Sequence, residues 1–273
     1  MDTFTKYGTI ILILLLPLSI WAQSGGLPKL SLRLEYEAST LQSFDLNDFY
    51  RSYNEYHASF ATQYFDTLSA NALSHPAIGL GTRYVIGDDF GFSSGLFLTY
   101  GRKSVRREAR FLTNIVTRSD LLTHDLNLQL DLGFHIKRKF FLHGHIAGRF
   151  RKSILEIGNI YPDGSYSLGN EYDILGVYQA NTNSLDLGFN AAFKIQKIYI
   201  PIGISWPMLG LSSDGMQWLQ DFDIRQSRQT ELPRDYEQWA NNPTNIDPAT
   251  DLVRSESFQA LRLNIGIEYW FGE

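Results

Sequence analysis

The connections between eight alternating segments constrain the fold of this chain more than any other feature of its sequence. Each segment places large apolar residues at every second position, which predicts a β-strand with one apolar face. These segments cover residues 30–38, 78–86, 90–100, 122–136, 140–154, 185–195, 198–206 and 261–271. Short turns are predicted at 87–89, 137–139 and 196–197, and long connections at 39–77, 101–121, 155–184 and 207–260.

Short turns at one end of the strands and long loops at the other, with an even strand count, are typical of a transmembrane β-barrel. A soluble sandwich has no need to gather its long loops on one side, and ordinary domains rarely carry so many. Each alternating segment approaches or exceeds the ~9–11 residues that a strand needs to cross a bilayer. The sequence therefore favours strands that span a membrane.

The apolar face of each predicted strand carries no Asp, Glu, Lys or Arg through its middle. A membrane demands this pattern, because an Arg or Lys at the bilayer midplane costs roughly 2–4 kcal/mol. Aromatic residues stand near the strand ends, where interfacial girdles are expected. Closure into a ring satisfies every backbone group in the hydrocarbon. We expect the apolar face to meet lipid and the polar face to line a lumen.

From Leu30 to Phe271 the chain resembles the eight-stranded bacterial outer-membrane barrels of the OmpA/OmpX type. Its last strand, LRLNIGIEYWF, is similar to the aromatic-terminated strand by which that family is recognised for insertion, although Gly272 and Glu273 follow it here. The resemblance is architectural and brings no catalytic or binding motif. It implies an all-β, eight-stranded antiparallel up-and-down transmembrane barrel in the cell outer membrane of a Gram-negative cell. It also implies that the short turns face the periplasm and the long loops are extracellular.

The N-terminus has the pattern of a secretory signal peptide. Lys6 precedes an apolar run, and Ala22 stands before a polar stretch. We expect cleavage after Ala22, which leaves residues 23–273 as the barrel domain. An uncleaved anchor is the alternative, but the run is shorter than the ~20 residues that a spanning helix needs. The chain has no cysteine and a net charge of -5, which argue against disulfides, thiolate metal sites and a nucleic-acid partner.

An eight-stranded barrel has an interior just wide enough for side chains to fill, so we expect a packed, non-conducting lumen. The inward-facing cations and anions balance six to six, which predicts an internal ion-pair network rather than an ion-selective ring. The predicted network comprises Arg33, Glu35, Glu37, Arg83, Asp125, Asp131, His145, Arg149, Arg151, Asp186, Lys194, Arg262 and Glu268.

The three-residue turn at 137–139 fixes a register for the hairpin that it closes. If residue 136 pairs with residue 140, then Asp131 faces His145, Asn127 faces Arg149 and Asp125 faces Arg151. Opposite charges directly across a ladder stabilise it by up to ~1 kcal/mol. The complementarity of these pairs supports the register.

His143 and His145 point the same way on one predicted strand, near Asp131 and His135 on its neighbour. Two histidines with a nearby carboxylate could bind zinc. The alternative, which we favour, is that these groups fill the lumen and bond to Asp131 and its neighbours. We predict no metal and no other cofactor.

Ser119, His124 and Asp125 could suggest a lipid-modifying hydrolase of the kind found among similar barrels. Strand parity places His124 on the lipid side and Asp125 in the lumen, so the two cannot readily form an orienting pair. We therefore predict no catalytic residues and no enzymatic activity, with a lipid-modifying enzyme as the third hypothesis for the function.

The second long connection begins with a basic segment, RKSVRREAR. Its guanidinium groups match phosphate bidentately, so lipopolysaccharide phosphates are a predicted partner. The alternative is a solvated β-extension with charges on both faces, and the sequence does not decide between the two. The basic residues are Arg102, Lys103, Arg106, Arg107 and Arg110.

The first long connection predicts an amphipathic helix over residues 45–61, with Asp45 as its N-cap. We expect its aromatic stripe to pack on the barrel mouth or on other loops, with binding of a protein or glycan as the alternative. The fourth, from Trp218 to Asp251, suits a surface lid or recognition element. The favoured function is a surface barrel whose loops bind lipopolysaccharide or another surface partner. The alternative is an accessory subunit of a secretion or envelope-assembly complex, docked through its extracellular loops.

Overall fold

Eight antiparallel strands close into a ring within the residues that the computed structural model describes: 28–40, 45–69, 72–168, 174–213, 217–218, 232–242, 253 and 261–271. The ring strands are β1 (Lys29–Thr40), β3 (His75–Ile86), β4 (Phe90–Phe111), β5 (Val116–Ile136), β6 (Phe140–Ile160), β8 (Gly176–Ile195), β9 (Ile198–Ser213) and β11 (Leu261–Trp270). Each strand pairs with the next in this order, and β11 pairs with β1 to complete the ring. The predicted up-and-down barrel is confirmed.

The signal peptide predicted over residues 1–22 lies outside the described residues. No helix in the described part of the chain is both long and apolar enough to cross a membrane.

All three predicted short turns are present, at 87–89, 137–139 and 196–197. Tight hairpins of this kind need positive φ, which Lys137 (50°), Arg138 (49°) and Gln196 (55°) adopt. The register predicted from the second turn is confirmed, because Asp131 lies opposite His145 and Asp125 opposite Arg151. The turns therefore fix which side chains meet inside the barrel.

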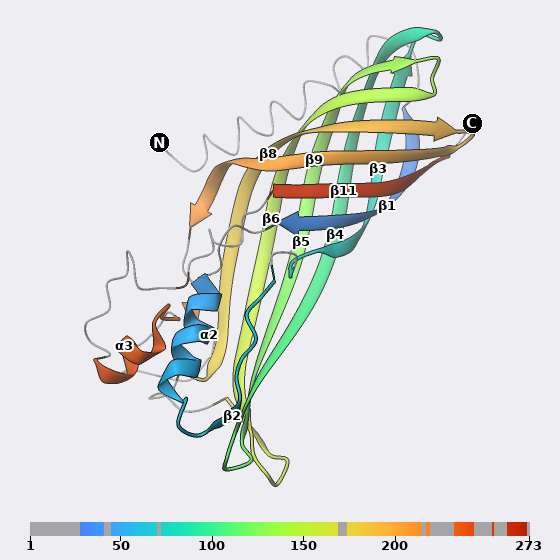
Figure 1. Cartoon of the computed structure of the whole chain (residues 1–273). Coiled ribbons are helices and arrows are strands. Elements are labelled where there is room, and N and C mark those ends of the chain that lie inside the picture. The colour runs from blue at the N-terminus through green and yellow to red at the C-terminus, as the bar shows by residue number, and fades with distance from the viewer. Residues whose placement is uncertain are drawn as a thin grey trace.

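The prediction of long loops at 101–121 and 155–184 is wrong in its boundaries. β4 runs on to Phe111 and β5 begins at Val116, so a four-residue turn replaces the first of these loops. β6 and β8 are also longer than predicted, and Figure 1 shows the four strands running past the ends of β1, β3 and β11. The basic segment is thus part of a β-extension.

Side chains continue to alternate between the two faces through this extension, but most apolar residues now stand at inward positions. Within the ring, the outward positions are apolar and the inward positions polar. Beyond it, Leu121, Leu155 and Ile157 face inward and are buried, while Arg106 and Glu108 lie on the outward face. A sheet packs its apolar face against an apolar partner. The ring and the extension must therefore have their apolar partners on opposite sides of the same strands.

One helix covers the inward face of the extension, and a second packs against the first. α2 (Asp45–Tyr56) confirms the predicted helix but ends at Tyr56, and α3 (Tyr236–Asn241) lies beside it (Figure 1). The aromatic stripe of α2 packs on the barrel mouth as predicted, since Phe49, Tyr50 and Tyr53 are buried in a core shared with the extended strands. Three short strands complete the described elements: β2 (Ala61–Gln63), β7 (Tyr166–Ser167) and β10 (Gln217–Trp218).

Large apolar side chains are exposed all round the outside of the ring. On β4 this belt runs from Phe90, which is 68% exposed, to Tyr100, which is 42% exposed. That distance is about 34 Å along a strand, or about 26 Å in height at a tilt of ~40°. The height matches the ~25 Å apolar band of outer-membrane barrels.

We predict that Phe49→Ala loosens the cap and leaves the ring intact. Removing a fully buried Phe costs about 3–5 kcal/mol, so local opening of α2 should become more frequent by a factor of about a hundred to several thousand. Limited proteolysis of the folded protein measures this opening as faster cleavage near α2. Tyr56→Ala is the control, because that side chain is 41% exposed. Equal cleavage of the two variants would contradict the packing described.

Candidate functional site

The lumen holds two ion-pair networks, one above the other. The first lies toward the short turns and joins Arg33 and Arg83 to Asp131 and Glu268. Arg83 Nη2 lies 3.1 Å from both Asp131 Oδ2 and Glu268 Oε2, and Arg33 Nη2 lies 3.0 Å from Glu268 Oε2. All four side chains are fully buried. Charges removed from water in this way persist because each one is paired.

A phenylalanine stands among these charges. Phe97 lies under both arginines of the first network, with its ring centroid 3.6 Å from the Cζ of Arg33 and 4.9 Å from that of Arg83. Such cation–π contacts are strongest when both partners are desolvated, as they are here. The neighbouring strand makes room for the ring with Gly81, where an added Cβ would overlap the Phe97 side chain. The lumen is closely packed at this level.

The second network lies toward the mouth and centres on Arg149. Its guanidinium donates to Glu37 (2.6 Å), Asp125 (2.8 Å) and Asp186 (3.2 Å). Arg151 also donates to Asp125, and Arg262 to Asp186. These side chains come from five different strands, β1, β5, β6, β8 and β11. The network therefore ties opposite walls of the barrel together.

Three other predicted lumen residues lie beside these networks. Glu35 is buried 3.9 Å from Arg33, and its Oε2 accepts no hydrogen bond from the described residues. His145 is buried opposite Asp131. Lys194 lies half-buried near the short turns, with its Nζ 4.2 Å from the centroid of the Trp270 ring. Glu35, Lys194 and His145 thus lie in the lumen without belonging to the two closely bonded networks.

Both ring nitrogens of His143 are engaged in the lumen. Nε2 contacts Ser93 Oγ and lies 3.3 Å from Arg83 Nη1, and Nδ1 lies 3.2 Å from the Tyr199 hydroxyl. With both nitrogens engaged, His143 could bind a metal together with His145 only by giving up one of these contacts. These contacts are those of a polar side chain that fills the lumen.

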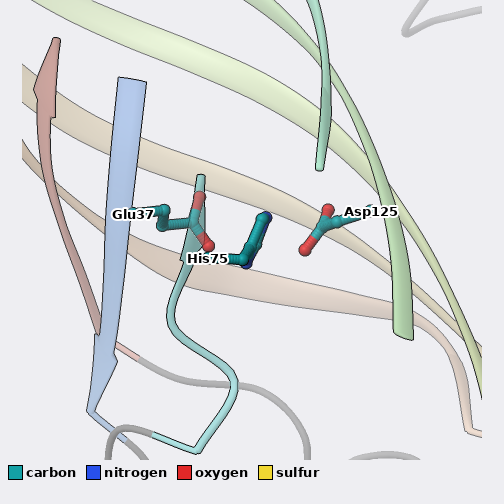
Figure 2. Close-up of side chains that lie close together, drawn as sticks. All are labelled: Glu37, His75 and Asp125. Carbon is teal, nitrogen blue, oxygen red and sulfur yellow. The ribbon is translucent and has the colours of Figure 1, made fainter. Parts of the chain in front are cut away.

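The structure brings a different set of possible metal ligands together, in Glu37, His75 and Asp125. One ligand atom from each lies within 4.8 Å of the others, and all three residues are buried. Figure 2 shows the His75 ring lying between the two carboxylates. Its Nδ1 donates to the Leu73 carbonyl at 2.9 Å, and Gly101 leaves space for the ring, since an added Cβ there would overlap the imidazole.

The carboxylates of this cluster do not suit a metal cation, because three guanidinium groups already form ion pairs with them. Arg149 and Arg151 lie against Asp125, and Arg149 and Arg262 lie against Glu37. A divalent ion placed here would add two positive charges among three buried arginines. We interpret the cluster as the upper edge of the mouth network.

Ser119 and His124 lie on opposite faces of β5, as parity predicted. The Ser119 hydroxyl faces inward and is bonded to the Tyr50 hydroxyl of α2 at 2.7 Å. His124 faces outward, where its Nδ1 is 2.6 Å from the hydroxyl of Tyr100. Burial raises the pKa of Tyr50 to about 12. Ser119 therefore holds the cap in place, and the described geometry does not pair it with His124.

The five basic residues of the β4 extension do not form one patch. Arg102, Arg106 and Arg110 lie on its outward face, whereas Lys103 and Arg107 lie on the inward face opposite Thr123 and Ser119. Arg106 is paired with Asp120 at 2.7 Å, and Arg110 with Glu108 at 3.4 Å.

Sequence reasoning missed His75 and Phe97. His75 stood inside a predicted loop, and nothing in the sequence marked it as the first residue of a strand. Phe97 is a large apolar residue at an inward position, where alternation alone predicts a polar one. The signal that could have found Phe97 is the pair of inward glycines nearby, Gly81 and Gly95.

No family model matches the chain, and no curated protein matches it. Several solved structures resemble it, among them two outer-membrane proteins. One is Ail, the attachment invasion locus protein of Yersinia pestis, in complex with the heparin analogue sucrose octasulfate; it is 11% identical, with 89% of this chain and 99% of that chain covered and a TM-score of 0.34. The other is a major outer membrane protein from Thermus thermophilus, 9% identical over the same shares, with a TM-score of 0.39.

We predict that Arg149→Met destabilises the whole barrel by about 3–5 kcal/mol, because it leaves three buried carboxylates short of their shared cation. The urea midpoint for loss of the compact, heat-modifiable band on gels measures this change. Arg106→Met removes an exposed ion pair from the extension and should shift the midpoint far less. Similar shifts for both variants would show that the mouth network does not tie the walls together.

Proposed function

We propose that this protein is an integral outer-membrane β-barrel, exported by a cleaved signal peptide, whose packed lumen does not conduct and whose extracellular elements bind a surface ligand. The observation that carries the proposal is the contrast between the two faces of the ring. Its outer face is a continuous apolar belt of membrane height, and its inner face is filled with paired charges. Only lipid satisfies both faces at once.

The extracellular end supports a role in binding. The extended strands, α2 and α3 share an apolar core of their own, which is more than a barrel needs for closure. An open hollow of about 640 Å³ lies beside α2, lined by Asn47, Arg51, Asn54, Glu55 and Tyr64 among others. Its wall is mostly apolar with a few polar groups, which suits a partner that presents both kinds of surface.

Lipopolysaccharide is the first ligand that we propose. Three residues of the basic segment, Arg102, Arg106 and Arg110, face outward, and Arg102 lies directly above the belt, at the level where head-group phosphates lie; Lys103 and Arg107 face inward. Guanidinium groups bind phosphate bidentately. The neighbour Ail was solved with a polyanionic sugar, but its similarity to this chain is too low to argue from.

The two alternatives find less support. Docking into an assembly complex through α2 would need an exposed aromatic face, but that face is buried against the extended strands. A lipid-modifying hydrolase would need Ser119 beside His124, and these side chains lie on opposite faces of β5.

The absence of cysteine allows a direct test of location and orientation. We expect Thr113→Cys, in the turn between β4 and β5, to react with a membrane-impermeant maleimide on intact cells. Asp88→Cys, in a short turn, should react only after the outer membrane is permeabilised. The reverse pattern would contradict the orientation, and protection of both positions in intact and permeabilised cells would contradict the outer-membrane location.

A further inference from the structure

Just above the apolar belt, one row of side chains crosses three neighbouring strands on the outside of the barrel. Arg102 of β4 is paired with His124 of β5, and His124 is paired with Lys152 of β6. Neighbouring strands lie ~4.8 Å apart, so the three Cα atoms span about 10 Å. The row below consists of Tyr100, Leu126 and Phe150, and all three side chains are exposed. The basic row is thus the first polar level that a lipid would meet beside these strands.

The charges of this row are not neutralised by the protein. Within the described residues, neither Arg102 nor Lys152 forms an ion pair, and both side chains are exposed. The outward arginines above them are different. Arg106 and Arg118 share Asp120, at 2.7 and 3.0 Å, and Arg110 lies 3.4 Å from Glu108. On the outward face of the described part of β4, β5 and β6, Arg102 and Lys152 are thus the basic residues of the extension that no carboxylate neutralises.

His124 is held in the middle of the row. Its Nδ1 is bonded to the hydroxyl of Tyr100 at 2.6 Å, and the two rings lie 6.1 Å apart. The contact fixes the imidazole and leaves Nε2 for another partner. A guanidinium, an imidazole and an ammonium side by side offer donors of three geometries to one group of oxygen atoms.

We propose that Arg102, His124 and Lys152 form a binding site for the phosphate of a lipid head group in the adjoining leaflet. The inference rests on the proposed membrane-spanning function and replaces the linear basic segment with a row across three strands. Phosphate fits because it is small, doubly or singly anionic and rich in acceptors. A lipid is the source because the row faces outward, directly above side chains that contact acyl chains.

The test uses the full chain in non-ionic detergent and lipid A carrying two phosphates as the probe, with native mass spectrometry as the readout. The variant R102Q/H124Q/K152Q should bind this lipid A about tenfold more weakly than the wild type, since two fixed charges near the head groups are lost. The matched control R106Q/R110Q removes two outward arginines that are already paired, and should stay within about twofold of the wild type.

Two further binding measurements, with different probes, identify the ligand. Lipid A without its phosphates should bind the wild type and the row variant equally, because the row contributes only through phosphate. Inorganic phosphate alone should bind weakly, and binding as strong as that of phosphorylated lipid A would overturn the lipid as the source. Unchanged binding by the row variant, or an equal loss in the paired-arginine control, would overturn the site.

Insertion into phospholipid vesicles, followed by the heat-modifiable gel shift, separates this inference from the function on which it rests. If the wild type does not insert, the proposed membrane function fails and the site fails with it. If the wild type and the row variant both insert and bind lipid A alike, the site alone is wrong. The single variants R102Q and K152Q repeat the comparison should the triple variant not fold, and each should weaken binding.

Discussion

The apolar side chains of the long strands lie outward within the ring and inward from the level of Leu121 and Leu155 on, and the lumen and the cap both follow from this reversal. Below it, the strands are apolar outside and ionic inside. Above it, the outward face is mainly charged and the inward face carries the apolar residues of a second core, which α2 covers, with α3 packed against α2. Hydrophobic burial has no fixed direction, so each part of a strand turns its apolar side toward its own apolar surroundings. One continuous sheet thus serves two cores.

The lumen follows from this constraint. With the apolar residues committed to the outer face, the interior is filled by polar side chains that must be paired, because an unpaired buried charge is costly. Arginine suits this role, since one guanidinium can bond three carboxylates from different strands, as Arg149 does. Phe97 and Trp270 complete the packing through contacts with cationic groups.

Much of this architecture could be predicted from the sequence, because period-two alternation and turn length are local signals. They placed the three short turns, the register of β5 with β6 and the helix at Asp45. The extension was missed because strands were expected to end where apolar residues left the outward face. At Leu121 and Leu155 they had moved to the other face. The contacts of His75 and Lys194 depend on segments distant in sequence, which no local pattern reports.

The level at which the apolar face reverses can be measured directly with spin labels on the outward positions of β5. Cysteines placed singly at Leu130, Leu126, His124 and Asp120 would be labelled in vesicles and their collision rates with oxygen and a water-soluble nickel chelate compared. We expect oxygen to dominate at Leu130 and Leu126 and the chelate to dominate from His124 onward. Oxygen dominance that continues to Asp120, or access of the chelate at Leu130, would contradict the reversal.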